Sequence, residues 1–329
     1  MPHNPSRPRL RSGVKQYCSA LCLSVISLLF QGCKDTPSES SPAQTPAAEY
    51  SPSATKLVLL GTGTPIPDST AQGPASAVVT GESAYLVDAG TGVVRQAQAA
   101  YENGISQLRP DTLRIAFITH LHSDHTLGLP DLIFTPWIVG ANEGMDIYGP
   151  PGLKKMVSYI LLAWEDDLYI REKSKDPTHA IANNIRVHEI KPGQVFKNNE
   201  ITVTAFPVKH GKWEHVYGYR FQTADRTIVI SGDTTPTQTV IDACNGCDIL
   251  LHEVYSHTGF MAGPPSWRSY HAAYHTSTVE LAQLAEKAQP KLLVLYHKLF
   301  FGQTEDGLVA EITNQYPGKV SLGTDLAVY

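Results

Sequence analysis

Charged residues and cysteines are scarce in this 329-residue chain, and no low-complexity tract extends beyond its first sixth. Only 17% of the residues are charged whereas 42% are hydrophobic, which excludes a disordered chain. Collagenous and heptad patterns are missing, and so is any repeat of fixed short period, which argues against fibrous proteins, propellers and solenoids. What remains is a globular body of the α/β or β-sandwich class, long enough to bury one large core.

Basic residues are outnumbered by acidic ones over most of the chain. The formal net charge is -5, and Arg7, Arg9, Arg11 and Lys15 all lie in an N-terminal stretch that contains no acid. The remainder is therefore more negative than the whole chain. Because proteins bind nucleic acids largely through basic patches that neutralise phosphates, this balance argues against nucleic acid as a partner.

Residues 1–33 have the pattern of an export signal, in which a basic start precedes the apolar run CSALCLSVISLLF. The run is too short for a comfortable membrane span. It ends in Phe30-Gln31-Gly32-Cys33, which is similar to a bacterial lipobox, so we predict a lipid anchor at Cys33. An ordinary signal peptide and an uncleaved anchor are the alternatives. Because Lys34 follows the cysteine, the predicted location is the periplasm, at the outer membrane.

Residues 34–55 are rich in Pro, Ser and Ala and are predicted to form a disordered tether. Cys18, Cys22 and Cys33 belong to the export segment, which leaves Cys244 and Cys247 as the only cysteine pair of the body. A C-x-x-C pair can be a redox motif or half of a zinc site, but no second pair and no thioredoxin-like context accompany it. We expect an incidental pair at a helix end, or a local disulfide in an oxidising compartment.

From residue 56 to residue 329, short apolar runs alternate with amphipathic ones and are punctuated by Gly, Pro and Asp. Strands are expected at 57–61, 76–81, 84–90, 113–119, 184–190, 201–208, 216–221, 227–234, 248–254 and 291–297. Helices are expected at 93–105, from 152 to near 164, at 237–243 and at 276–288. Two successive sets of strands interleaved with helices predict two sheets with helices outside them.

The densest group of metal-binding side chains follows the expected strand at 113–119, in the sequence THLHSDH. Residues two apart project to the same side of an extended segment, so His120 and His122 can converge on one cation. A turn into a helix would direct Asp124 and His125 toward a second cation. Imidazole and carboxylate groups suit zinc, with iron or manganese as alternatives. Surface histidines in a polar loop are a poorer explanation of so dense a group.

The hexapeptide from His120 to His125 resembles the H-x-H-x-D-H motif of the metallo-β-lactamase superfamily. The resemblance runs from residue 57 to near residue 323 and includes GTGTP, VDAG, THLHSDH, PVKH, SGDT, LLHEV, YHTST and LLVLYH in the family's order. It implies an α/β fold of the four-layer αββα sandwich type. It also implies a bridging role for Asp233 and an orienting role for Asp88. The implied ligands of two divalent metal ions are His120, His122 and His210 for one, and Asp124, His125 and His297 for the other.

Within the superfamily, the sequence is most similar to the branch of ribonuclease Z and of arylsulfatase-type and phosphodiesterase-type hydrolases. GTGTP at 61–65, His252-Glu253 and the segment HTST that starts at His275 carry this resemblance. It implies that His275 protonates the leaving oxygen with the aid of Glu253, and His271, one helical turn earlier, is the rival. The predicted catalytic residues are Asp124, His275 and Glu253. The aromatic stretches 164–169 and 267–274 can line a substrate pocket or pack in the core.

Two departures from ribonuclease Z influence the predicted function. His297 is followed by Lys298-Leu299-Phe300-Phe301, and no long basic Gly/Pro-rich insertion lies between residues 152 and 210. With the export signal and the acidic body, they favour a dinuclear hydrolase that cleaves a small or medium phosphate or sulfate ester through a metal-bridging hydroxide. The alternatives are a ribonuclease Z-type endoribonuclease that processes tRNA 3' ends and a non-catalytic metal-binding protein. The sequence is also compatible with a homodimer.

Overall fold

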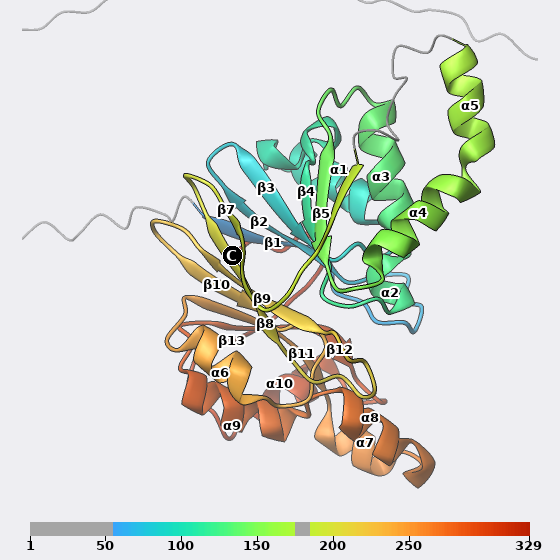
Figure 1. Ribbon diagram of the computed structural model, residues 1–329. Coiled ribbons are helices and arrows are strands. Elements are labelled where there is room, and N and C mark those ends of the chain that lie inside the picture. Colours follow the sequence, from blue (N-terminus) through green and yellow to red (C-terminus); the bar gives the residue numbers. More distant parts are fainter. Residues whose placement is uncertain (1–54, 175–184) are drawn as a thin grey trace, which may run out of the picture. The chain divides into compact units, whose positions relative to one another are not determined.

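The computed structural model describes residues 55–174 and 185–329, which build two β-sheets packed face to face between two layers of helices (Figure 1). The predicted export segment, Cys33 and the predicted tether up to residue 54 lie outside the described residues. Thr55, the last residue of the predicted tether, is buried, and its Oγ1 donates to Asp225 Oδ1 at 2.6 Å. In the part of the chain that the structure describes, no helix has the length and apolar character needed to cross a bilayer.

The first sheet contains six strands that pair in chain order. The first two pairs are antiparallel and the other three are parallel. The second strand is buried along its whole length, as expected for a sheet that is covered on both faces. The strands are β1 (Lys56–Gly61), β2 (Ala75–Thr80), β3 (Ser83–Val87), β4 (Ile115–Phe117), β5 (Met145–Gly149) and β6 (Ile185–Glu189).

The second sheet contains seven strands, which also lie in sequence order from one edge to the other. Pairing is antiparallel in its first half and parallel in its second half, so the two sheets have similar layouts. The strands are β7 (Gly193–Lys197), β8 (Thr202–Pro207), β9 (Tyr217–Gln222), β10 (Thr227–Ile230), β11 (Ile249–Tyr255), β12 (Leu293–Leu299) and β13 (Val320–Leu322).

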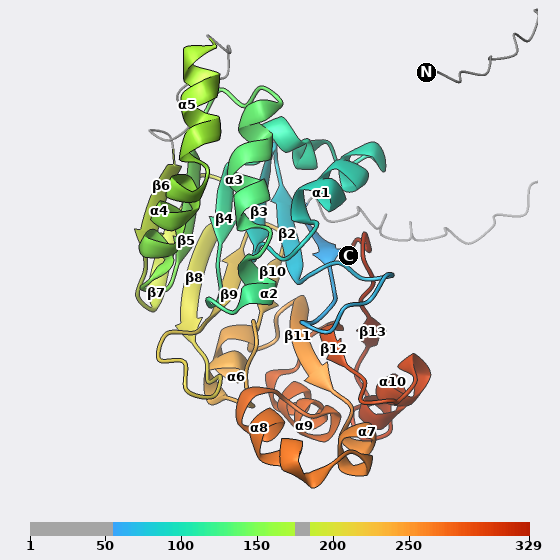
Figure 2. The same ribbon diagram turned by 90° about the vertical axis from the view of Figure 1, so that its right-hand side faces the viewer.

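Helices cover the outer face of each sheet, as Figures 1 and 2 show. On the first sheet lie α1 (Val93–Glu102), α3 (Leu129–Ile138) and α4 (Leu153–Ala163), and on the second lie α6 (Gln238–Cys244), α9 (Thr278–Ala288) and α10 (Glu305–Thr313). The remaining α-helices are α2 (Ser123–Thr126), α5 (Glu165–Lys173), α7 (His257–Ala262) and α8 (Arg268–Tyr274).

Three apolar cores hold these layers together. One core lies between the first sheet and its helices, a second between the two sheets, and a third between the second sheet and its helices. Phe117, Tyr219 and Phe221 are among the large side chains of the middle core, and their rings contact one another. The order of layers is therefore helix, sheet, sheet, helix, and the predicted four-layer αββα sandwich is confirmed.

Cys244 and Cys247 form a disulfide between the end of α6 and the start of β11. Both are buried in the outer core of the second sheet. Asn245 and Gly246, which separate them, have positive φ angles of 38° and 81°, so the chain reverses within four residues. Of the alternatives for this pair, the structure has the local disulfide, and among the described residues neither cysteine belongs to a group of metal-binding side chains.

Candidate metal centre and active site

The predicted site residues gather at one end of the sandwich, where the carboxyl ends of β3, β4, β8, β10, β11 and β12 meet. The two sheets place their parallel strands so that the loops after these strands face one another, with α2 close to them (Figure 2). Loops at the carboxyl ends of parallel strands are the common place for a binding site in such folds.

Three histidines converge from two loops. His120 and His122 follow β4 in extended backbone, and His210 follows β8. The Nε2 atoms of His120 and His210 each lie 3.0 Å from Nδ1 of His122. His210 Nδ1 donates to the carbonyl oxygen of Tyr274 at 2.6 Å, so its Nε2 presents a lone pair to the centre of the group.

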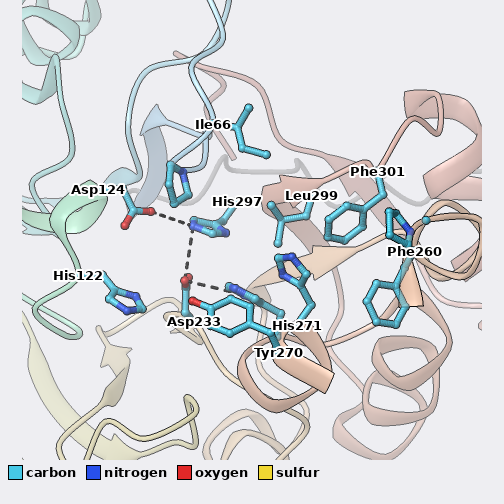
Figure 3. A pocket seen from close by; sticks show the side chains of 14 residues that line it. Ile66, His122, Asp124, Asp233, Phe260, Tyr270, His271, His297, Leu299 and Phe301 are labelled. Atoms are coloured by element: carbon cyan, nitrogen blue, oxygen red, sulfur yellow. Dashed lines mark hydrogen bonds and ion pairs between the residues drawn. The ribbon is translucent and has the colours of Figure 1, made fainter. Parts of the chain in front are cut away.

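A second group comes from α2 and β12. The short helix that starts at Ser123 turns Asp124 and His125 away from the direction of His122, as the sequence predicts. His297 Nε2 lies 3.2 Å from Asp124 Oδ2, and His125 Nε2 lies 3.5 Å from the same oxygen. Figure 3 shows the side chains of Asp124 and His297 directed toward one another.

Asp233, in the loop after β10, lies between the two groups. Its Oδ2 is 3.5 Å from His297 Nε2 (Figure 3). The same oxygen is 3.9 Å from His210 Nε2, and Oδ1 is 3.4 Å from His125 Nε2. Within each group, the candidate ligand atoms lie within 4.8 Å of one another. The structure thus brings together the complete set of predicted ligands: His120, His122, Asp124, His125, His210, Asp233 and His297.

Two buried acceptor atoms at this site indicate that a metal ion fits it. His125 Nδ1 lies 2.8 Å from the carboxylate of Asp88 and therefore carries the proton, which leaves the lone pair of Nε2 facing Asp233. Both His125 Nε2 and Asp233 Oδ1 are buried and have no hydrogen-bond partner among the described residues. Buried acceptors of this kind need a donor or a cation, and imidazole and carboxylate ligands fit a divalent transition metal.

The charges of the ligands also suit a metal. Burial lowers the pKa of His120 well below its ordinary value, so its imidazole is neutral, which is the form that binds a metal. Burial alone would raise the pKa of Asp233, but His297 and His125 outweigh it and hold the pKa well below its ordinary value. Burial lowers the pKa of His125, but the carboxylates of Asp233 and Asp88 outweigh burial and raise it well above its ordinary value, so a metal that binds Nε2 must displace a proton from it.

Two side chains of the site, those of His297 and Asp88, project from strained backbone positions. Tyr296 pairs with Glu253 and Lys298 pairs with Val254, so His297 is the extra residue of a β-bulge. Its φ angle is 45°, and that of Asp88 is 62°. A non-glycine residue with positive φ costs roughly 1–3 kcal/mol, and such strain concentrates at functional sites, where bulges redirect side chains.

Glu253 and His275 form a second buried pair beside the ligands. Glu253 Oε1 accepts hydrogen bonds from the backbone N–H groups of Thr276 at 2.9 Å and Thr234 at 3.3 Å, and its Oε2 lies 3.4 Å from His275 Nδ1. Burial raises the pKa of Glu253 well above its ordinary value and lowers that of His275 to about 4. His271, the predicted rival, has its ring centroid 6.0 Å from that of His275 on the same cavity wall.

A cavity of about 450 Å³ opens directly onto the ligands. Its lining residues are Pro65, Ile66, His122, Asp124, Asp233, Phe260, Gly263, Pro264, Tyr270, His271, His275, His297, Leu299 and Phe301. Of the two aromatic stretches 164–169 and 267–274, the second supplies Tyr270 to the wall. Trp164 of the first stretch lines a separate hollow along α4.

Other histidines lie away from the centre. His188 pairs with Asp146 at 2.7 Å and stacks on Tyr148, as expected of a packing residue. His3 and His179 are outside the described residues. Trp213, which the sequence analysis missed, lies against His122, with the ring centroids 5.0 Å apart and its indole N–H directed at His122 Nε2. No motif marks Trp213, and only its position three residues after His210 points to it.

Comparisons with known proteins agree with this geometry. The β-lactamase superfamily domain matches residues 84–298. "Ribonuclease Z" of Mycobacterium sp. (strain KMS) is 34% identical over 278 residues, which cover 82% of this chain and 94% of that protein. "Ribonuclease Z" of Mycobacterium bovis (strain BCG / Pasteur 1173P2) is 31% identical over 280 residues, covering 82% and 96%. The crystal structure of human tRNase Z, short form, has the same fold, with a TM-score of 0.61, 22% identity and coverage of 83% and 98%.

These relatives correct two predictions. The preference for a small or medium phosphate or sulfate ester is wrong, and so is the argument against nucleic acid as a partner, because relatives matched over nearly their full length are ribonucleases. The ribonuclease alternative is the one that they support. The error has a physical cause: a net charge averages over the whole chain, whereas a scissile phosphate meets only the local field, which bound cations dominate.

Proposed function

The chain belongs to the β-lactamase superfamily and to the ribonuclease Z family of ester-bond hydrolases within it, and on that premise we propose that it cleaves phosphodiester bonds in RNA as an endoribonuclease. The observation that carries the proposal is the match to "Ribonuclease Z" at 34% identity over 94% of that protein. The converging ligands and the adjacent Glu253–His275 pair support it. Precursor tRNA is the substrate class that we propose to test first.

Two divalent cations are proposed to bind through the converging side chains, with zinc as the favoured metal and iron or manganese as alternatives. One set of ligands is His120, His122 and His210, the other is Asp124, His125 and His297, and Asp233 is shared. When bound, the cations would supply Lewis acidity and lower the pKa of water, so that hydroxide is available near neutral pH.

The protein's own groups position the reaction. Asp88 and the carbonyl of Tyr274 fix the rings of His125 and His210 through their Nδ1 atoms, so that both Nε2 atoms face the centre. Asp124, predicted to be catalytic as well as a ligand, has a carboxylate on the cavity wall that can accept the proton of the attacking water.

His275 is proposed to donate a proton to the leaving oxygen. The oxygen of water forms a bond to phosphorus, the bond from phosphorus to the leaving ribose oxygen breaks, and that oxygen takes the proton held at the His275 ring. Burial lowers the pKa of His275 to about 4, so the protonated ring must be stabilised during the reaction. The carboxylate of Asp233, whose Oδ2 lies 3.9 Å from His275 Nδ1, and the negative phosphate of the substrate both favour it. Glu253, whose Oε2 lies 3.4 Å from the same nitrogen, holds the ring in place.

The test is cleavage of a precursor tRNA with a 3' extension by purified, metal-loaded protein. We expect one specific cut near the 3' end, and loss of that cut in His122→Ala and Asp233→Ala. His188→Ala, which changes a histidine away from the cavity, is the matched control and should retain activity. Metal-loaded protein that hydrolyses an aryl phosphodiester but leaves precursor tRNA intact would contradict the proposal.

The ligand assignment has a separate test. Elemental analysis should find two metal ions per chain in the native protein and fewer in His122→Ala and Asp233→Ala, with zinc in the highest amount. A metal content that neither substitution changes would overturn the assignment, whatever the activity.

A further inference from the structure

The cavity at the metal centre has two chemically different ends. At one end lie the ligands Asp124, Asp233 and His297, and at the other lie the side chains of Phe260, Leu299 and Phe301 (Figure 3). Ile66 and Tyr270 complete the apolar part of the wall. A substrate that fills the cavity must therefore present an anionic group at one end and an apolar group at the other.

Histidine is the only basic residue type among the described residues of the wall. Lys and Arg are missing from its described lining residues, and its only carboxylates, Asp124 and Asp233, belong to the candidate ligands. The apolar end thus offers neither a counter-ion for a phosphate nor a partner for an ammonium group. An uncharged, flat group is the kind of ligand that it can accommodate without an unpaired charge.

The aromatic rings at that end are held by their own packing. The Phe260 ring contacts Tyr255 at 4.8 Å and Phe301 at 5.7 Å between centroids, and Phe301 contacts His271 at 4.8 Å. Tyr255, Phe260 and Leu299 form a small buried cluster. Because these rings are already fixed, they lose little conformational entropy when a ligand stacks on them.

We propose that this apolar end binds the unpaired base of the nucleotide on the leaving-oxygen side of the scissile phosphate. The inference rests on the RNA cleavage proposed above. A nucleotide has one anionic and one flat uncharged part, and single-stranded bases are commonly bound by stacking on aromatic side chains. His275, the proposed proton donor to the leaving oxygen, lines the same cavity as the aromatic wall, which places the departing nucleotide beside that wall. The volume of about 450 Å³ lies within the range of small-molecule sites.

The test compares RNA substrates that lack one base. Metal-loaded protein is given a cleavable RNA with all bases, the same RNA with an abasic ribose on the leaving side, and one with an abasic ribose on the other side. We expect kcat/KM to fall by roughly tenfold to a hundredfold for the first abasic RNA, as base stacking predicts, and to change much less for the second. Short product oligonucleotides with and without the terminal base should differ similarly as competitive inhibitors.

Substitutions at the aromatic end of the cavity test whether the loss of kcat/KM comes from base stacking there. Phe301→Ala, and Phe301→Leu as a gentler change, should lower kcat/KM for the intact RNA about tenfold and leave that for the leaving-side abasic RNA unchanged. Tyr159→Ala removes an exposed ring on α4 outside the cavity and is the matched control. Equal cleavage of intact and abasic RNA, or an equal loss on both in Phe301 variants, would overturn the base site while RNA cleavage stands. No cleavage of any RNA would overturn the proposed function and the base site with it.

Discussion

At the scale of single residues, Asp88 links the backbone of the first sheet to the metal centre. Its Oδ1 accepts from the backbone N–H of Thr119 at 2.8 Å, and its Oδ2 lies 2.8 Å from His125 Nδ1. The side chain is buried and its φ angle is positive, so it occupies a costly backbone position to make these contacts. Carboxylates that hold a ligand histidine in this way fix its tautomer and ring orientation.

We predict that Asp88→Asn lowers metal affinity by about tenfold to a hundredfold, because an amide cannot replace both acceptor oxygens. The dissociation constant is measured by competition with a chromogenic chelator. Asp111→Asn, in the short 3-10 helix Pro110–Thr112 away from the centre, is the control and should have native affinity. Native affinity in Asp88→Asn would contradict the orienting role.

The proton donor is a second prediction at this scale. His275→Gln should lower kcat by roughly a hundredfold or more for RNA, whose ribose oxygen is a poor leaving group, and much less for a nitrophenyl phosphodiester, which scarcely needs protonation. Metal content, measured on the same preparations, should not change. A uniform loss across leaving groups, or a loss of metal, would assign His275 to another role.

At the scale of elements, Glu311 of α10 connects the segments that surround the cavity. Its carboxylate accepts from Ser256 Oγ at 2.8 Å, from the backbone N–H of His257 at 2.8 Å and from Thr278 Oγ1 at 2.5 Å. These partners lie at the start of α7 and of α9, and α9 directly follows the segment that contains His275. Burial raises the pKa of Glu311, but the hydrogen bonds outweigh it and hold the pKa below its ordinary value.

We predict that Glu311→Gln lowers the free energy of unfolding at pH 7 by about 1–3 kcal/mol. The folded-state pKa is depressed, so this stabilisation is complete above the unfolded value of about 4.3 and is lost as the pH falls through the folded value. The difference in melting temperature between native protein and variant should therefore shrink below about pH 4. Glu305→Gln, exposed at the start of α10, is the control. An undiminished difference at low pH would show that the carboxylate charge is not the cause.

At the scale of the whole molecule, we propose that the N-terminal segment determines which RNA the enzyme meets. The basic start, the apolar run and Gly32-Cys33 support export and lipidation, followed by a tether to the domain. An exported enzyme has no access to cytoplasmic precursor tRNA. If the segment acts as proposed, the physiological substrate is RNA outside the cytoplasm, and precursor tRNA serves as a test of chemistry alone.

We predict that fatty-acid labelling in a bacterial host marks the native protein and is lost in Cys33→Ser, because the thiol is the site of lipidation. Cys18→Ser, within the same apolar run, is the control and should keep the label. Equal labelling of the native protein and Cys33→Ser would contradict the anchor, as would a soluble, full-length protein in the cytoplasm.

The sequence by itself predicted the helices and strands whose formation depends on residues close together in the chain. Continuous apolar runs marked β1 to β4, and helical spacing marked α1, α4 and α9, because burial repeats with the period of the local backbone. It did not reveal β5 or α3, and Pro136 interrupts the pattern of the latter. Nor did it reveal α5, which has no buried residue and hence no apolar face to detect.

The metal-binding motifs were recognisable in the sequence because each is a short stretch with its own spacing, and resemblance to a known family linked them. Only the tertiary structure decided that His297 projects from a β-bulge, that Trp213 covers His122 and that Phe260 and Phe301 face the cavity. The preference for a small ester was wrong for the same reason, since a net charge does not say where the charged side chains lie in the folded protein. Contacts between distant segments depend on the register and packing of two sheets, and these are properties of the folded chain as a whole.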